Sequence, residues 1–352
     1  MHFNQIKQEI KWNSLILGIL SLVPILIGYL WFHEPLLFNV GLVTISLFVP
    51  IARNHTGLYL ALLQFVLIWL CFTLLFFTFQ IPYLFAFFTA AIAFGVIYFT
   101  RYDSNLRSLA NFIFIPAVYL SCELHESLQH TAITHVYRQF VLLMPIALLT
   151  NMVLVIVMHA LADSKLSNDP SGLEFKSLTQ RILHGEAWGK IEENWVKQAA
   201  AIFFGILIAA SIVIYKPIPH GEWVIWSTAA VITADLSSSK KKIQDRLIGL
   251  FIGVPLGFFV GQFLPKNIVT YSIAVLAVMM SLVTFKTYRV AFTCRCFFIA
   301  LASYLATATP QIALERVENV ILGGIIGMAS LYIADNIAGN FSKRKTQRSK
   351  KT

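Results

Sequence analysis

The sequence predicts an all-helical membrane protein with about twelve transmembrane helices in two parallel repeats of six. Long apolar stretches recur along almost all of its 352 residues, and Lys and Arg gather in every second gap between them. Hydrophobic residues make up 57% of the chain and charged residues only 12%, whereas soluble domains carry roughly 25% charged residues. The mean hydropathy of +0.72 agrees with a chain that is mostly surrounded by lipid.

Twelve apolar stretches are candidates to cross a bilayer, whose core of roughly 30 Å needs about 20 helical residues. Those in the first half are Leu15–Phe32, Leu36–Ile51, Leu58–Phe79, Ile81–Phe99, Leu109–Cys122 and Phe140–Leu161. Those in the second half are Ala199–Tyr215, Glu222–Ala234, Leu247–Leu264, Ile268–Phe285, Val290–Ala308 and Val317–Ala334. Stretches 36–51, 109–122 and 222–234 are short, and the sequence leaves open whether they cross fully.

The distribution of cations predicts the orientation. If the N-terminus is cytoplasmic, 22 of the 27 Lys and Arg residues fall in inside segments, four fall in outside segments, and Arg295 falls within a stretch. Cytoplasmic loops carry an excess of Lys and Arg in membrane proteins. The pattern therefore predicts that both termini are cytoplasmic.

A polar segment divides the chain into two similar halves. We expect a first transmembrane repeat over 1–162, a linker with an amphipathic surface helix over 163–197, a second repeat over 198–338, and a basic tail over 339–352. Each half has six stretches with a basic loop after the second. Because six is even, both halves share one orientation, which predicts a pseudo-two-fold axis along the membrane normal.

Several classes of protein are disfavoured by what the chain contains. The net charge of +10 is concentrated in inside loops and the tail, where anionic lipid is a better partner than nucleic acid. The segment Gly185–Lys190 has three residues between its glycines, where a phosphate-binding loop has four. At least three of the four cysteines fall in apolar stretches, so they indicate neither a disulfide framework nor a zinc site. We therefore predict no enzyme activity, no cofactor and no metal.

Glycines recur at four-residue spacing in two stretches of the second half. They are Gly249, Gly253, Gly257 and Gly261 in one stretch, and Gly323 and Gly327 in the last. Small residues at this spacing let two helices approach closely. The ladder predicts either static helix packing or a crossing that slides.

Charged residues at or within the apolar stretches are the candidates for handling an ion. Arg295 lies about six residues, or roughly 9 Å, into its stretch, which suits either an anion contact or a cation that snorkels to the surface. Asp235 and Arg246 flank a loop of three serines and three lysines that would attract anions. Arg316 and Glu318 stand at the outer mouth of the last stretch, where a carboxylate could exchange protons or simply be solvated.

Other side chains in the stretches have ordinary explanations. Most tryptophans lie near the ends, where they anchor helices at the membrane interface, but Trp226 lies deeper. Polar residues such as Gln64 and Asn151 are expected to bond neighbouring helices.

The second half resembles the fusaric acid resistance family, whose relatives include bacterial aromatic acid exporters. The family's central signature is similar to three consecutive features of this chain: Trp223, the run Ser227–Ile232, and the pattern Arg246-xx-Gly249-xxx-Gly253. Glu315-Arg316 followed by Gly323 and Gly327 is similar to its closing segment. The resemblance covers roughly Lys197–Ala338. The first half lacks the arginine–glycine ladder, and the linker is shorter than the large cytoplasmic domain of some members.

The resemblance implies a plasma-membrane protein that exports small organic anions, often aromatic carboxylates, with the proton-motive force. From the positions of the charged residues and the depth of Trp226, we expect the substrate to be bound by Arg295, Arg246, Asp235, Arg316 and Trp226, and protons to be coupled through Glu318. Some relatives work with a periplasmic adaptor protein, and a homodimer is also open. There are two alternatives. One is an anion channel or uniporter with the same fold, and the other is an envelope scaffold subunit that transports nothing. The expected location is a bacterial inner membrane.

Overall fold

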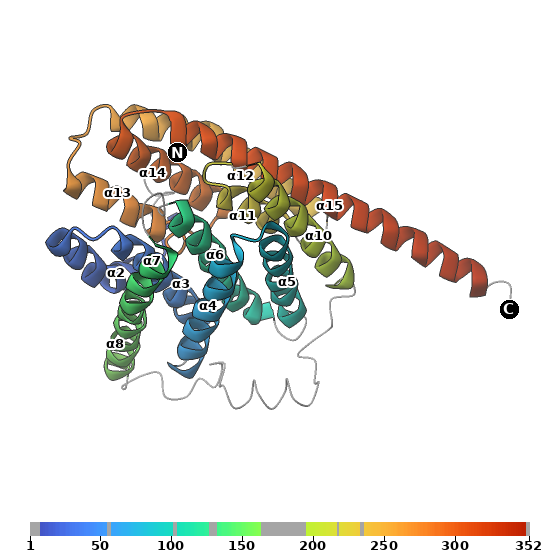
Figure 1. Cartoon of the computed structure of the whole chain (residues 1–352), viewed down its shortest axis with the longest axis horizontal. Coiled ribbons are helices and arrows are strands. Elements are labelled where there is room, and N and C mark those ends of the chain that lie inside the picture. Colours follow the sequence, from blue (N-terminus) through green and yellow to red (C-terminus); the bar gives the residue numbers. More distant parts are fainter. Residues whose placement is uncertain are drawn as a thin grey trace.

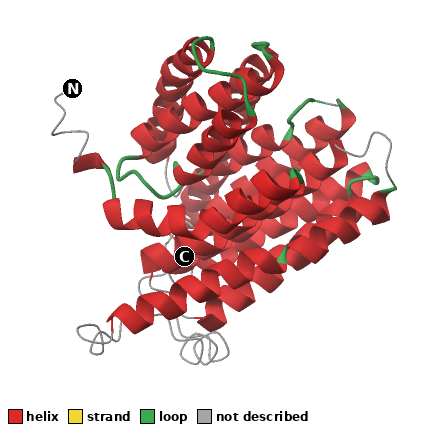
Figure 2. Cartoon of the chain, turned by 90° about the vertical axis from the view of Figure 1, so that its left-hand side faces the viewer, coloured by secondary structure: helices red, strands yellow, loops and turns green. Residues whose placement is uncertain are grey.

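The protein is a bundle of helices, seen here in a computed structural model (Figure 1). The structure describes residues 8–54, 58–100, 104–126, 132–162, 195–216, 218–232 and 236–349. Within these ranges the chain forms helices and connecting loops without a strand (Figure 2), apart from an isolated bridge between Ile10 and Phe285. The predicted amphipathic helix of the linker lies outside the described residues.

The helices follow the order of the predicted stretches. The first half contains α2 (Trp12–Phe32), α3 (Leu36–Asn54), α4 (Leu58–Thr78), α5 (Pro82–Thr100), α6 (Ser104–Glu126), α7 (Ile133–Leu143) and α8 (Pro145–Ala162). The second half contains α10 (Trp195–Tyr215), α11 (Glu222–Val231), α12 (Leu236–Gly261), α13 (Ile268–Met280), α14 (Tyr288–Thr307) and α15 (Gln311–Ser349).

Eight candidate spans in the described part are long and apolar enough to cross a membrane, with α7 and α8 counted together as Ile133–Val157. Two shorter apolar helices, Leu36–Ala52 and Ile268–Met280, fall below that length. Neither α6, which has 23 residues, nor α11, which has 10, is among the eight, so whether the predicted stretches there cross the membrane stays open. The finding is an all-helical multi-pass protein, and the number twelve stays a prediction.

Several helix boundaries differ from the sequence prediction, and two of the differences involve charged segments. The serines and lysines after Asp235 are not a loop, because α12 begins at Leu236 and carries them on its first turns. Similarly, α15 begins at Gln311 and runs unbroken through the basic tail to Ser349, so that it projects beyond the bundle (Figure 1). Lys, Arg and Gln are good helix formers, and backbone hydrogen bonding continues past the point where the apolar stretch ends.

Helices of the two halves pack on each other reciprocally. Within the first half α4 packs on α6 and α3 on α8, and within the second half α12 packs on α14 and α11 on α15. Between the halves, α10 packs on α5 and α13 packs on α2. The first helix of each half therefore contacts the fourth helix of the other.

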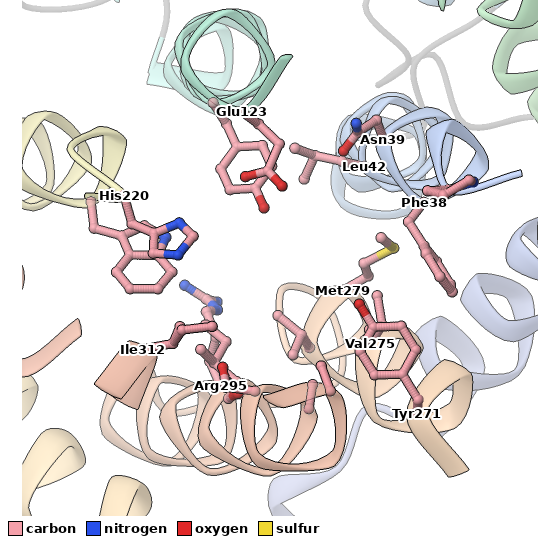
Figure 3. A pocket seen from close by; sticks show the side chains of 18 of the residues that line it. Phe38, Asn39, Leu42, Glu123, His220, Tyr271, Val275, Met279, Arg295 and Ile312 are labelled. Atoms are coloured by element: carbon pink, nitrogen blue, oxygen red, sulfur yellow. Dashed lines mark hydrogen bonds between the residues drawn. The ribbon is translucent and has the colours of Figure 1, made fainter. Parts of the chain in front are cut away.

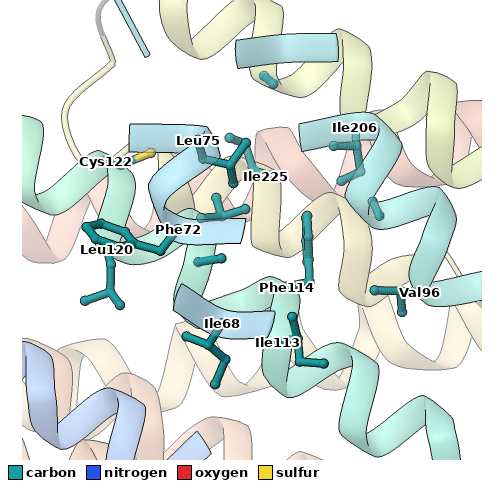
Figure 4. Close-up of a cluster of buried hydrophobic side chains, with 14 of the residues drawn as sticks. Ile68, Phe72, Leu75, Val96, Ile113, Phe114, Leu120, Cys122, Ile206 and Ile225 are labelled. Carbon is teal, nitrogen blue, oxygen red and sulfur yellow. The ribbon is translucent and has the colours of Figure 1, made fainter. Parts of the chain in front are cut away.

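A buried apolar cluster joins the two halves (Figure 4). From the first half, the cluster contains Ile68 and Phe72 of α4 and Phe114 of α6. From the second half, it contains Ile206 of α10 and Ile225 of α11, and all five side chains are at most 3% exposed. Polar side chains within the helices bond across to neighbours, as the sequence predicted. Gln64 donates to the Ser46 carbonyl at 2.8 Å. Asn151 donates to the Thr44 carbonyl at 3.0 Å.

The spaced glycines lie at two close helix crossings. A Cβ atom on any of Gly249, Gly253, Gly257 or Gly261 would clash with α14, and at Gly257 the clash is with the Phe297 carbonyl oxygen. Gly323 and Gly327 of α15 approach α11 in the same way, and Thr228 of α11 donates to the Gly323 carbonyl at 3.0 Å. These crossings fix α14 against α12 and α11 against α15, and α11 and α14 line the cavity described next.

Candidate functional site

A cavity of about 420 Å³ lies between the two halves. Its walls come from α3 and α6 of the first half and from α11, α13, α14 and the start of α15 in the second half. Figure 3 shows Glu123, His220 and Arg295 around one side of the cavity, with Tyr271, Val275 and Met279 of α13 on the other. The volume is within the range of roughly 300–1,000 Å³ typical of small-molecule sites, and most of the lining is apolar or aromatic.

Arg295 supplies a buried positive charge to this cavity. The residue is 8% exposed, and its guanidinium lies over the Trp226 ring with 5.5 Å between the guanidinium carbon and the ring centroid. Its Nε donates to Ser281 Oγ at 3.1 Å, and its Nη2 approaches the Ser281 carbonyl oxygen at 3.5 Å. Both partners are neutral, so the charge is left without a counter-ion among the described residues.

Two further arginines are buried behind the cavity wall in similar surroundings. Arg246 of α12 lies over the Phe292 ring at 4.4 Å and donates to Ser227 Oγ at 2.6 Å. Arg316 of α15 lies over the Trp223 ring at 4.8 Å and is 2% exposed. Neither forms an ion pair with a described carboxylate, so three arginine charges gather in the second half.

The structure therefore brings some of the predicted site residues together and separates others. Arg295 and Trp226 line the cavity, while Arg246 and Arg316 are buried near it without lining it. Glu318 is exposed on α15 and lines a different surface depression beside Lys216 and Asn319. Asp235 lies outside the described residues.

Next to the cavity is a group of titratable side chains that the sequence analysis did not assemble. We call Glu123, Glu126, His220, Glu222 and Glu315 the histidine–glutamate cluster. The His220 Nδ1 atom lies 3.7 Å from Glu126 Oε2 and 3.7 Å from Glu222 Oε1, and its Nε2 atom lies 3.9 Å from Glu315 Oε2. Glu123 lines the cavity together with His220.

His220 is held firmly in the loop between α10 and α11. Its backbone is in the left-handed region, with φ of 52°, and its N–H donates to Glu126 Oε1 at 3.1 Å. The Asn319 side chain donates to the Pro219 and His220 carbonyls at 2.8 and 3.1 Å. The His220 ring stacks on Trp223 with 4.6 Å between the ring centroids. A strained backbone conformation held by several bonds is common at functional positions.

The electrostatics of the cluster are dominated by its carboxylates. Burial of the ring lowers the pKa of His220, but the adjoining Glu222, Glu126 and Glu123 outweigh burial and raise the pKa to about 9. Glu222 is 1% exposed, and neither of its carboxylate oxygens has a hydrogen-bond partner among the described residues. The carboxylates therefore favour the protonated, positively charged form of the His220 ring.

A sequence signal for the cluster exists only in retrospect. Glu123 and Glu126 stand three residues apart on α6, which places them on one helix face, but almost 100 residues separate them from His220. Such a pair at a helix end is ordinarily solvated, and only the packing of α6 against α11 brings the two parts together.

The apolar helices define a multi-pass membrane protein, and a largely apolar cavity of small-molecule size lies between its halves. Residues 199–330 match the sequence model of the family described as fusaric acid resistance protein-like. The match covers α11 to α14 and parts of α10 and α15, where the resemblance was identified, and confirms it there. Comparisons with curated proteins and with solved structures gave no match.

Proposed function

We propose that the protein exports small organic anions, preferentially aromatic carboxylates, across a bacterial inner membrane. The observation that carries the proposal is the Arg295 guanidinium, which is buried beside the cavity and hydrogen-bonds to neutral groups only. A cation in such a place is costly unless a partner compensates it. A carboxylate matches the guanidinium fork in geometry and supplies the missing charge.

Aromatic side chains on several walls favour an aromatic substrate. Trp226 of α11 stacks on Arg295, and the other walls of the cavity carry Trp223 of α11, Tyr119 of α6, Phe38 of α3 and Tyr271 of α13. Rings stacked or packed edge to face gain about 0.5–1.5 kcal/mol beyond the area that they bury. In this arrangement Arg295 binds the carboxylate and Trp226 contacts the ring.

The proposal includes transport by alternating access between two parallel repeats. The reciprocal packing of α10 on α5 and of α13 on α2 supports a pseudo-two-fold relation between the halves. The cavity lies between these halves, and substrate sites of repeat-built transporters lie at the interface of their repeats. Both termini are proposed to be cytoplasmic, from the distribution of cations.

Trp226→Leu is expected to weaken binding of benzoate by about 2- to 10-fold, because the ring contact is lost. Binding of cyclohexanecarboxylate, which has the same carboxylate and a similar size but no aromatic ring, is expected to change less. Isothermal titration of the purified protein with both acids measures the difference. An equal loss for the two acids would show that Trp226 contributes shape and not aromatic contact.

Export is tested by flux from proteoliposomes loaded with a panel of aromatic and aliphatic acids, with protein-free vesicles as the measure of passive leak. We expect saturable efflux of aromatic acids that a pH gradient accelerates. A flux that ignores the gradient but follows the membrane potential would indicate the channel or uniporter instead. No protein-dependent flux of any acid would overturn the proposal and favour an envelope scaffold.

Proton coupling has its own test. Glu318 is the carboxylate that we propose to exchange protons, since it is exposed at the mouth predicted to face outside. Glu318→Gln is expected to remove the acceleration by the pH gradient while downhill exchange of the acid continues. If acceleration survives in this variant, the coupling group lies elsewhere.

A further inference from the structure

The histidine–glutamate cluster carries more negative charge than its protein neighbours neutralise. Four carboxylates face one imidazole, and the guanidinium of Arg316 stacks on Trp223 and forms no ion pair with them. Glu222 is buried with both oxygens unpartnered, and His220 Nδ1 is buried without a hydrogen-bond partner as well. Buried charges in proteins are paired or coordinate metals.

We propose that the histidine–glutamate cluster binds a divalent transition-metal cation of the zinc class. Its first three ligands are Glu123, Glu126 and His220, whose ligand atoms all lie within 4.8 Å of one another. Glu222 is the fourth, because its Oε1 faces the same imidazole nitrogen as Glu126. Imidazole nitrogen and carboxylate oxygen are the ligands of many four-coordinate zinc sites.

The spacing of these atoms fits coordination better than direct hydrogen bonding. The two distances of 3.7 Å from His220 Nδ1 are too long for hydrogen bonds. Ligand atoms that each lie about 2.1 Å from one tetrahedral ion are about 3.4 Å apart. The two separations from Nδ1 therefore exceed the spacing of tetrahedral ligands by only about 0.3 Å.

The protein around the cluster fixes the ligands in place. The backbone N–H of His220 donates to Glu126, and Asn319 holds the loop carbonyls on either side. Outer contacts of this kind orient metal ligands, and their loss costs about 10- to 100-fold in metal affinity. Because His220 and Glu123 also line the cavity, a bound cation would offset much of the negative charge that the cluster presents to the cavity.

The test is zinc binding by the full chain, purified in lipid nanodiscs and stripped with a chelator. Equilibrium dialysis against Zn²⁺ at pH 7.5, with metal and protein quantified, is expected to give one ion per chain. His220→Gln and, as a second variant, Glu123→Gln are expected to lower the affinity at least 10-fold. Quenching of Trp223 fluorescence by Co²⁺ reports the same site, since that ring stacks on His220.

His33→Gln is the matched control. His33 also has a left-handed backbone, with φ of 55°, and stands in the loop between α2 and α3, near the cavity but not lining it. We expect this variant to bind zinc as the wild type does. The proposal would be overturned if the wild type bound no zinc, which is the result expected of a cluster that binds protons and no metal. It would also be overturned if His33→Gln lowered zinc binding as much as His220→Gln does. The assay contains no organic anion, so its failure and the failure of anion export are separate results.

Discussion

Arg295→Met is expected to lower the affinity for benzoate by about 10- to 100-fold, as measured by isothermal titration. Methionine keeps an unbranched side chain of the length of the arginine stem but removes the guanidinium that faces the cavity. A hydrogen bond to a charged group contributes about 1.5–3 kcal/mol, and the carboxylate would lose its counter-ion in a largely apolar space. The stack on Trp226 would be lost at the same time.

One further variant separates charge from geometry, and another is a control outside the cavity. Arg295→Lys retains a positive charge but not the planar fork, so we expect a smaller loss than with methionine. Arg138→Met removes an exposed arginine of α7, outside the cavity, and is expected to bind benzoate as the wild type does. Unchanged benzoate binding in Arg295→Met would remove Arg295 from the binding site and with it the main support for anion export.

The helices could be predicted well from the sequence because apolar length is a direct requirement of the bilayer. Each predicted stretch overlaps a helix, although Phe140–Leu161 is divided between α7 and α8, and the other errors concern where helices begin and end. The helix α12 continues through Lys240 because hydropathy marks the apolar part of a helix and not its hydrogen-bonded limits. The short α11 was predicted longer, as Glu222–Ala234, since nothing in its composition marks the end at Val231.

The site could be predicted only in part, and the reason is physical. An arginine or a tryptophan deep in an apolar stretch is unusual by itself, so Arg295 and Trp226 are recognisable without a structure. Glu126 at a helix end and His220 in a loop are each ordinary, and their meaning comes from the contact between them. Contacts between halves depend on which helix faces meet, and apolar periodicity is weak in helices that are hydrophobic all round.

Gly257→Ala is the substitution that we expect to destabilise the helix bundle most. The added Cβ atom would meet the carbonyl oxygen and carbon of Phe297, which are backbone atoms of α14 and cannot rotate away. Overpacking of this kind costs typically 1–3 kcal/mol, and here the upper part of that range is expected. Alanine favours the helix by about 1 kcal/mol over glycine, which offsets only part of that cost. Thermal unfolding in detergent, followed by tryptophan fluorescence, measures the lowered midpoint.

Gly324→Ala is the control for this effect, since it makes the same chemical change at a helical glycine with room for it. Its added Cβ atom would lie 4.0 Å from the nearest atoms, in the Ile243 side chain, which is ordinary contact. We expect an unchanged or slightly higher midpoint, because the helix propensity gain is then not opposed. If Gly257→Ala is as stable as Gly324→Ala, α12 and α14 can separate at little cost, and the crossing is a sliding contact and not a fixed one. That result would assign the glycine ladder to the motion of transport, whereas a large loss assigns it to static packing around the cavity.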